Sequence, residues 1–256
     1  MSIKQFTRLY LNVVKNAVVS IFPKGFRDLI VLLAKFKICS RNDLKLNECL
    51  RDAIQNFLLV NKDGIPELGI PRVDPVELSK TTMKGTPPYD YDQVYTNVKV
   101  YGNSRSQISN VEAIITDSEI TIHFTAFTDK VQFVADYEFK DAFLPTENVT
   151  VDSTGICVVD VVNFKFDISL NGKITNVGQV VIDEVKISQA SFDNLVHNFT
   201  SDDVAVSQLI TLSFEESTPK LSSGQRGFPE MYADAYKGYA NLVFSKLSFE
   251  ELFPKK

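Results

Sequence analysis

Hydrophobic and polar residues alternate at every second position through the middle of the chain. The clearest run lies at residues 162–170, where the apolar members are Val162, Phe164, Phe166, Ile168 and Leu170. Other runs of the same kind occupy residues 98–100, 111–115, 120–124 and 131–139. A period of two is typical of strands with one buried and one solvated face, as in antiparallel sheets. The pattern therefore predicts a sheet, with a hairpin turn at Asn171-Gly172 and a return strand over residues 174–187.

Helical spacing replaces this alternation on both sides of the predicted sheet. The earlier helix follows an apolar stripe with intervals of three and four residues, made by Leu46, Cys49, Leu50, Ala53, Ile54, Phe57 and Leu58. A second helix is expected to begin near Ser201, whose hydroxyl can cap it. A final helix is expected over residues 229–246, with a stripe that includes Tyr232, Tyr236 and Tyr239. This order predicts an α+β fold in which a helix covers the apolar face of one curved sheet.

Two cysteines and a proline-rich segment stand out near the start of the predicted domain. Cys39 and Cys49 are ten positions apart, a spacing that permits a disulfide worth about 2–3 kcal/mol. A free, buried Cys49 accounts for the spacing equally well. Residues 64–75 read Gly-Ile-Pro-Glu-Leu-Gly-Ile-Pro-Arg-Val-Asp-Pro, which no regular helix can accommodate. Their interleaved aliphatic residues predict an ordered, partly buried connector.

Together these segments resemble the insect takeout and juvenile-hormone-binding protein family. The resemblance is carried by residues 39–50 and 64–75, and residues 97–102, 191–195 and 240–254 follow in the order of the family. It covers about residues 36–254. Leu44 and Arg72 stand where the family often has proline, and tryptophan is absent from the chain. These departures bear on the identity of a ligand more than on the fold.

The resemblance implies an α+β fold of the tubular lipid-binding type. A long, highly curved antiparallel β-sheet would wrap around a long C-terminal helix and leave an elongated hydrophobic tunnel. Residues 35–256 would form this single domain. The resemblance also implies a Cys39–Cys49 disulfide and a secreted, extracellular carrier for a juvenile hormone, a terpenoid or a fatty-acid-like lipid.

Ligand contacts are expected from the inward-facing side chains of the predicted strands and helices. The apolar candidates are Ile122, Phe124, Phe133, Phe164, Phe166, Ile168 and Phe214, and the candidates for the polar head end are Tyr137 and Tyr236. At each of these positions the alternative is a core residue that packs on a helix. A second hypothesis for the whole chain is a protein-interaction or signalling module on the same fold, with the cavity collapsed and no lipid bound.

The amino-acid composition and net charge of the chain limit the classes of function that it can have. The formal net charge of −5 argues against a nucleic-acid surface, which needs a basic field. Nineteen phenylalanines and nine tyrosines indicate either a large core or a ring-lined cavity. Cys157 is expected to be a buried, inert thiol. The Asn-x-Thr triplets at Asn148 and Asn198 predict glycosylation of a secreted chain. We expect a monomer.

The first 34 residues have two interpretations. One is a signal or precursor segment, although its apolar run over residues 9–22 is interrupted by polar residues. The other is a basic amphipathic helix at a membrane surface, with positive charges at Lys4, Arg8, Lys15, Lys24 and Arg27. No run approaches the roughly 18 apolar residues of a membrane span.

Catalytic motifs are not evident in the sequence. Ser191, His197 and Asp193 form a triad on paper, but no nucleophile-elbow motif anchors it, and His197 is expected in a loop before a helix. His123 is expected on the solvated face of its strand. No residues have metal-ligand spacing, and no glycine loop for phosphate is present. We therefore expect a binding protein rather than an enzyme, without a cofactor or metal.

Overall fold

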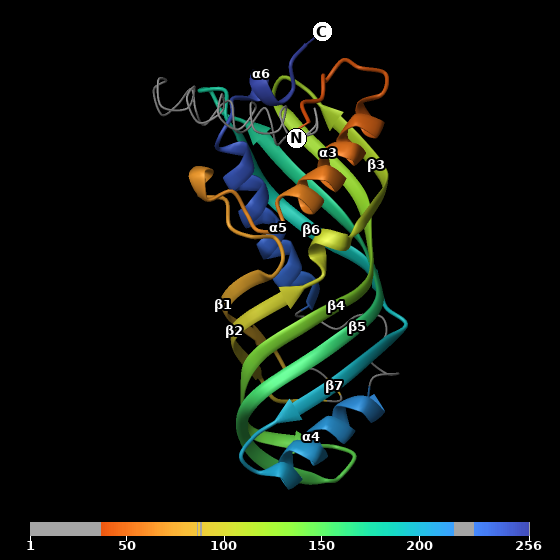
Figure 1. Ribbon diagram of the computed structural model, residues 1–256, viewed down its shortest axis with the longest axis vertical. Helices are drawn as coiled ribbons and strands as arrows, with labels where there is room; N and C mark the ends of the chain where they lie inside the picture. The colour runs from red at the N-terminus through yellow and green to blue at the C-terminus, as the bar shows by residue number, and fades with distance from the viewer. Residues whose placement is uncertain (1–36, 86, 88, 218–227, 256) are drawn as a thin grey trace, which may run out of the picture.

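The computed structural model describes residues 37–85, 87, 89–217 and 228–255, so the predicted precursor segment over residues 1–34 lies outside the described residues. Helix α3 (Leu46–Val60) comes first and helices α4 (Val204–Ser217), α5 (Phe228–Phe244) and α6 (Phe249–Leu252) come last. Between them lie β1 (Val76–Met83), β2 (Gln93–Tyr101), β3 (Gln107–Ile115), β4 (Glu119–Leu144), β5 (Val149–Ile174), β6 (Val180–Ser191) and β7 (Asn194–Thr200). Two 3-10 turns, η1 (Pro66–Leu68) and η2 (Asn103–Arg105), complete the described elements. Figure 1 shows an elongated molecule.

Two strands of 26 residues, β4 and β5, form the spine of the sheet. They pair antiparallel from Glu119↔Lys173 to Leu144↔Val149. Each long strand carries two shorter strands end to end along its other edge, β3 and β2 on β4, and β6 and β7 on β5. The strand order is therefore β3-β4-β5-β6 near one end of the molecule and β1-β2-β4-β5-β7 near the other. The predicted long, highly curved antiparallel sheet is confirmed.

Residues in the left-handed backbone region mark the irregular points of this sheet. Asn97 (φ 51°), Asn110 (φ 50°) and Asp141 (φ 48°) lie at shifts in strand register. Asn163 (φ 53°) lies where the neighbour of β5 changes from β7 to β6. Asparagine and aspartate tolerate this conformation better than other residues with a Cβ. Bulges of this kind bend the long strands, so these residues help to curve the sheet.

Helix α5 lies along the sheet in Figure 1 and packs against β6, with further contacts to β1. Asn241 on α5 bonds the backbone of Ile182 twice, because its Nδ2 donates to the carbonyl at 3.0 Å and its Oδ1 accepts from the amide at 2.7 Å. The helix thereby covers part of the edge of β6. The predicted final helix is confirmed to within two residues at its C-terminal end.

Three local predictions from the sequence were wrong. The hairpin between β5 and β6 turns at residues 175–179, where Thr175 N donates to Gln179 O at 2.8 Å, and Asn171-Gly172 lies inside β5. His197 lies in strand β7 rather than in a loop. Asp203 rather than Ser201 caps α4, since its Oδ1 accepts from the amides of Ala205 and Val206, both at 3.0 Å.

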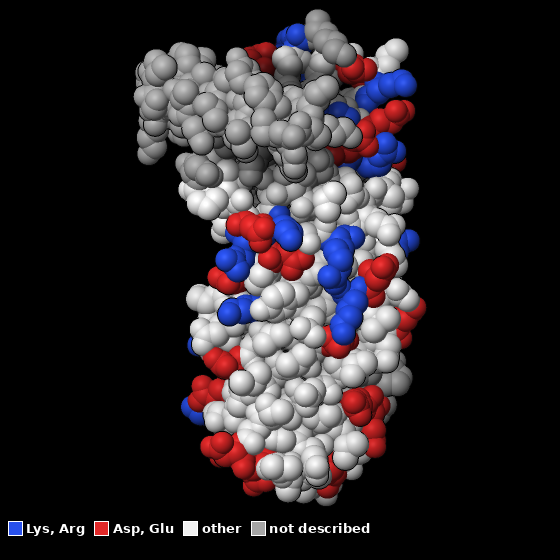
Figure 2. Space-filling model, in the orientation of Figure 1, with Lys and Arg blue, Asp and Glu red and all other residues white. Residues whose placement is uncertain are grey.

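Charged side chains of both signs are interspersed on the face shown in Figure 2, and they leave a broad uncharged area over its lower half. Among the described residues, charged side chains pair across strands or along one strand, such as Lys130 with Asp160 at 2.6 Å and Lys140 with Glu138 at 2.7 Å. The described part of this face therefore presents no basic field of the kind that binds nucleic acid.

Candidate ligand-binding site

A cavity of about 190 Å³ lies among α3, α5, the first part of β4 and the C-terminal segment. Its walls are almost wholly apolar. Side chains from α3 include Leu50, Ala53, Ile54, Phe57 and Leu58, and those from α5 include Met231, Tyr232, Tyr236, Tyr239 and Val243. The remaining walls come from Val73, Val76, Leu78, Val100, Ile122, Phe124, Leu170, Leu252 and Phe253, among others. Such a concave apolar space is typical of a site for a small hydrophobic ligand.

The disulfide region forms the side of the cavity near the start of the described chain. Cys39 and Cys49 are bonded, as the family resemblance implied, and both Ile38 and Cys39 contribute to the cavity wall. The bond joins the incoming segment to the first turn of α3. The apolar stripe predicted for this helix is therefore divided between the core and the cavity.

The proline-rich connector holds a third part of the wall in place. Ile65 and Ile70 are almost fully buried and pair their backbones at 2.8 and 3.1 Å. Gly64 (φ 80°) lies so close to the backbone of Ile70 that a Cβ would meet its carbonyl oxygen at 2.6 Å. These contacts make the connector an ordered structure, as predicted, and they place Val73 at the cavity.

An Arg41 cluster fixes the C-terminal segment beside the cavity. The Arg41 guanidinium bonds Glu250 at 2.7 and 3.0 Å, donates to the carbonyl of Phe253, and lies 4.6 Å from the ring centre of Phe249. Its side chain is only 2% exposed. Hydrogen bonding to Arg41 holds the pKa of Glu250 below its usual range, so the pair is ionised at neutral pH. The cluster therefore keeps Leu252 and Phe253 against the cavity.

Polar groups at the cavity wall are few. Lys37 is the one charged residue among the described residues that line it, and its Nζ pairs with Asp52 at 2.8 Å. Burial raises the pKa values of the Tyr232 and Tyr236 hydroxyls well above neutral pH, so both stay protonated. The hydroxyl of Tyr239 donates to the carbonyl of Arg72. The wall thus offers neutral hydrogen-bonding groups rather than a fixed interior charge.

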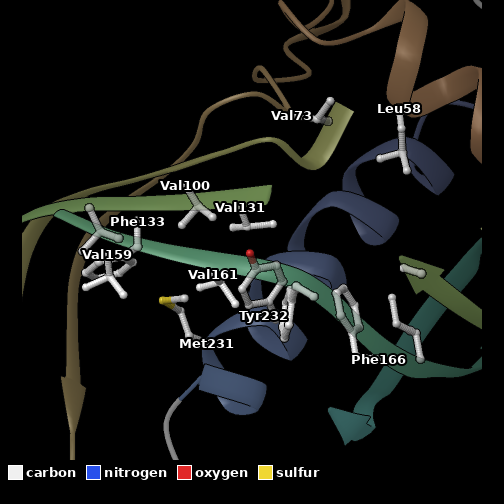
Figure 3. Packing of buried hydrophobic residues seen from close by; sticks show 14 of the residues in the cluster. Leu58, Val73, Val100, Val131, Phe133, Val159, Val161, Phe166, Met231 and Tyr232 are labelled. Carbon is white, nitrogen blue, oxygen red and sulfur yellow. The ribbon is translucent and has the colours of Figure 1, made fainter. Parts of the chain in front are cut away.

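The predicted ligand contacts fall into three places. Ile122, Phe124 and Tyr236 line the cavity. Phe164, Phe166 and Ile168 are buried on β5 but do not line it, and the rings of Phe164 and Phe166 both pack 5.5 Å from that of Tyr232. Figure 3 shows the Phe166 and Tyr232 rings side by side. Phe133, Tyr137 and Phe214 lie farther along the sheet, in a separate aromatic cluster.

That aromatic cluster fills the end of the molecule covered by α4. Its tightest contacts join Tyr89 to Phe214 at 4.5 Å, Tyr137 to Phe139 at 4.8 Å and Phe199 to Phe214 at 4.9 Å between ring centres. The Tyr137 hydroxyl is already hydrogen-bonded to Ser153 at 2.9 Å. This end of the interior is accordingly occupied by protein side chains.

Sequence reasoning missed most of the cavity wall. No ligand contact was predicted on α3, β1 or the C-terminal segment, because most of the lining was expected from the long alternating strands. The available signal was the helical stripe that begins at Leu46. Its members Leu50, Ala53, Ile54, Phe57 and Leu58 line the cavity together with residues of α5.

The structure does not arrange Ser191, His197 and Asp193 as a catalytic triad. His197 is 6% exposed, and its ring lies 5.3 Å from that of Phe214. Its Nδ1 has no hydrogen-bond partner among the described residues, and Asp193 instead accepts from Asn163 Nδ2 at 2.7 Å. A base that nothing orients cannot serve as the middle member of a triad.

No group of three or more histidine, cysteine, aspartate or glutamate side chains among the described residues is arranged to hold a metal ion. None of the described helices has the length and apolar character needed to cross a membrane.

Comparison with known proteins identifies the family. The family model of haemolymph juvenile hormone binding protein matches residues 12–254. The chain belongs to this family. The structure is similar to the crystal structure of Takeout 1 from Epiphyas postvittana, with a TM-score of 0.63 and 16% identity. The similarity covers 85% of this chain and 99% of Takeout 1, and at that identity it shows the fold.

A looser similarity joins the chain to lipopolysaccharide binding protein, with a TM-score of 0.32 and 9% identity over 81% of this chain and 41% of the other. That score is too low to support an argument. A search of curated proteins by sequence found no match. The family match begins at residue 12, within the segment predicted as a precursor.

Proposed function

We propose that this protein is a carrier that binds a small hydrophobic ligand in the cavity between α3 and α5. The observation that carries the proposal is an apolar cavity of about 190 Å³ in which the one charged residue among the described lining residues is already paired. Membership of the juvenile hormone binding protein family supports a lipid or hormone as the general class of ligand. A juvenile hormone, a terpenoid or a fatty-acid-like lipid would each present the apolar chain that this wall accommodates.

The driving force of binding would be burial of apolar surface. Each buried methylene contributes about 0.8 kcal/mol, so a chain of about eight carbons gains roughly 6 kcal/mol before ordering costs. The cavity exists in the protein without a ligand, so little of this gain would be spent on rearrangement. Since about 6 kcal/mol corresponds to a dissociation constant of roughly 40 μM before any ordering cost, an affinity between tens of micromolar and millimolar is expected for a ligand of this size.

Tyr236 is the candidate for recognising a polar group of the ligand. It lines the cavity, its hydroxyl remains protonated, and it makes no hydrogen bond to another described residue. Its neighbour Tyr239 donates to the protein itself and is less suited to the task. Tyr236 would donate to an alcohol, ester or aldehyde oxygen.

Displacement of a fluorescent hydrophobic probe tests the proposal. We expect 1-octanol and n-octane to displace the probe from the wild type. Tyr236→Phe should bind octanol about fivefold more weakly, the usual value of one hydrogen bond, and should bind octane unchanged. Failure of the wild type to bind any probe, with no lipid in organic extracts examined by mass spectrometry, would refute the carrier and favour the interaction module.

We also propose that the protein is secreted and acts outside the cell. A disulfide is stable in an oxidising compartment, and the Cys39–Cys49 bond supports this location. Both predicted glycosylation positions, Asn148 and Asn198, have exposed side chains. Recovery of the chain from the culture medium of cells that express it tests the location.

A further inference from the structure

A group of apolar side chains lies on the outer face of the sheet where β4, β5 and β7 run side by side. Strand register places Val134 on β4 beside Val158 on β5, and Val158 beside Asn198 on β7. Ile156 and Val196 lie on the same face, because alternate residues of a strand point the same way. Ile156 is 50% exposed and Val196 is 45% exposed. We call Val134, Ile156, Val158 and Val196 the outer patch.

The opposite face of these strand segments belongs to the interior. Ala135, Cys157 and Phe199 stand in register on β4, β5 and β7, and none of them is more than 3% exposed. The outer patch is therefore turned away from the core. Apolar residues that adjoin one another on a solvated face, rather than lie scattered, indicate a surface that something else covers.

Charged residues border the outer patch but are paired within the chain. On one side Asp136 accepts a hydrogen bond from Asn97 Nδ2 at 2.6 Å. On the other side Asp160 pairs with Lys130 Nζ at 2.6 Å. The broad uncharged area in Figure 2 lies over the region where Figure 1 labels β7. This surface therefore favours an uncharged occupant over a partner that is recognised by its charge.

Asn198 lies within this surface and carries a signal for the attachment of carbohydrate. The triplet Asn198-Phe199-Thr200 has the form Asn-x-Thr. Phe199 is buried, whereas the side chains of Asn198 and Thr200 are exposed on the outer face. Val158 is the register partner of Asn198, and Val196 lies two residues before it on β7. A sugar bonded to Asn198 Nδ2 would thus emerge next to the outer patch.

We propose that an N-linked glycan on Asn198 covers the outer patch and keeps the secreted protein monomeric. The inference rests on the proposed secretion, and it leaves the carrier function untouched. The donor is an oligosaccharide linked to a lipid diphosphate. The bond from sugar C1 to the phosphate oxygen breaks, a bond from C1 to Asn198 Nδ2 forms, Nδ2 loses one proton, and the lipid diphosphate leaves.

The glycan would act by changing what the outer patch presents to its surroundings. The sugar rings are bulky and carry hydrated hydroxyl groups, so the covered surface is no longer apolar. Without the glycan the nearest complement to the outer patch is the same patch on a second copy, since a two-fold axis brings identical surfaces together.

Sedimentation of protein secreted by insect cells, over a range of concentrations, tests the proposal. The wild type should sediment as one chain throughout. Asn198→Gln removes the glycan but keeps a polar side chain, and its weight-average mass should rise with concentration, by about twofold if two patches pair. Adding Ile156→Thr and Val196→Thr to Asn198→Gln should restore the mass of one chain, because threonine is polar but keeps the β-branch that suits a strand. Enzymatic removal of the glycan from the folded wild type should reproduce the association of Asn198→Gln.

Thr150→Ala is the matched control, because it removes the carbohydrate signal of Asn148 and leaves the outer patch unchanged. It should sediment as the wild type does. A secreted wild type without sugar on Asn198 in peptide mass spectrometry would overturn the proposal and leave secretion intact. So would an Asn198→Gln protein that remains one chain, or a triple variant that associates as strongly as Asn198→Gln. Retention of the wild type inside the cells would remove the proposed secretion and this inference together.

Discussion

Single asparagines help to decide where the long strands of this protein bend. Asn97, Asn110 and Asn163 adopt a left-handed backbone that costs most residues about 1–2 kcal/mol. Each also donates its side-chain amide across the sheet, to Asp136 at 2.6 Å, Thr125 at 3.2 Å and Asp193 at 2.7 Å respectively. In the sequence these residues look like ordinary polar positions of a strand. Their role depends on a backbone angle that periodicity does not report.

His197 is the residue whose chemistry differs most from its sequence context. It lies on the buried face of β7, and burial lowers its pKa to about 4 from 6.5. Leu195, His197 and Phe199 alternate as the buried positions of a strand. The pattern was missed because a histidine is buried less often than an aliphatic residue and was not counted as an apolar position.

Burial of His197 predicts a loss of stability in mild acid. The unfolded chain takes up a proton near pH 6.5, whereas the folded chain does so only near pH 4. The unfolded state therefore binds more protons between these values, and stability falls as pH decreases through that window. Urea unfolding of the wild type and His197→Leu should differ in this pH dependence by up to about 3 kcal/mol. Parallel curves for the two proteins from pH 7 to pH 4 would contradict the assignment.

At the scale of elements, helices cover sheet edges with hydrogen-bonding side chains. Asn47 and Gln55 on α3 accept from the β3 amides of Ala113 at 3.0 Å and Ile108 at 2.9 Å. Thr211 on α4 accepts from the amide of Phe199 on β7 at 3.1 Å. Asn241 on α5 accepts from the amide of Ile182 on β6 at 2.7 Å. Exposed edges invite pairing with other chains, so these contacts protect the fold as well as stabilise it.

Asn241→Leu should destabilise the protein by about 1–3 kcal/mol, because it leaves the amide and the carbonyl of Ile182 without their partner. Lys237→Ala is the control, since Lys237 also donates to β6, at the Asp183 carbonyl, from an exposed position. That change should cost less than about 0.5 kcal/mol. The free energy of unfolding in urea measures both, and equal costs would show that the Asn241 contacts contribute nothing special.

Periodicity predicted the spine of the sheet but not its pairing. Alternation over residues 120–139 and 162–170 reflects one buried face, and it marked parts of β4 and β5. The Asn171-Gly172 pair misled because Gly172 serves close packing rather than a turn. A Cβ there would meet the carbonyl oxygen of Val181 at 2.5 Å, so glycine is needed for the approach of β6. Strand β1 was missed because its exposed face carries mixed polar residues.

On the scale of the whole molecule, the two ends have different contents. One end holds the cavity, and the other holds the aromatic cluster beneath α4. The composition shows many phenylalanine and tyrosine residues, but it does not indicate which of them line a cavity and which fill the core. The family resemblance supplied the fold and the disulfide. It could not supply the division of the interior, because that division depends on how individual rings pack.

Secretion predicts carbohydrate on the outer surface. Asn198 lies on the exposed side of β7 opposite Val158, close to the half-exposed Ile156 and Val196. Treatment of protein secreted by insect cells with a glycosidase should lower its mass, and Asn198→Gln together with Asn148→Gln should abolish the change. A secreted wild type whose mass does not change would exclude modification of both positions while leaving secretion intact.

The Arg41 cluster has a practical consequence for measuring any of these properties. The Arg41 amide donates to the carbonyl of Pro254 at 3.2 Å, so the described beginning and end of the chain meet beside the cavity. An affinity tag or a surface linker fused after residue 256 would therefore begin close to the cavity wall, which includes Leu252 and Phe253. The turn between β4 and β5 lies at the opposite pole in Figure 1, so immobilisation through that turn keeps the support away from the cavity in binding experiments.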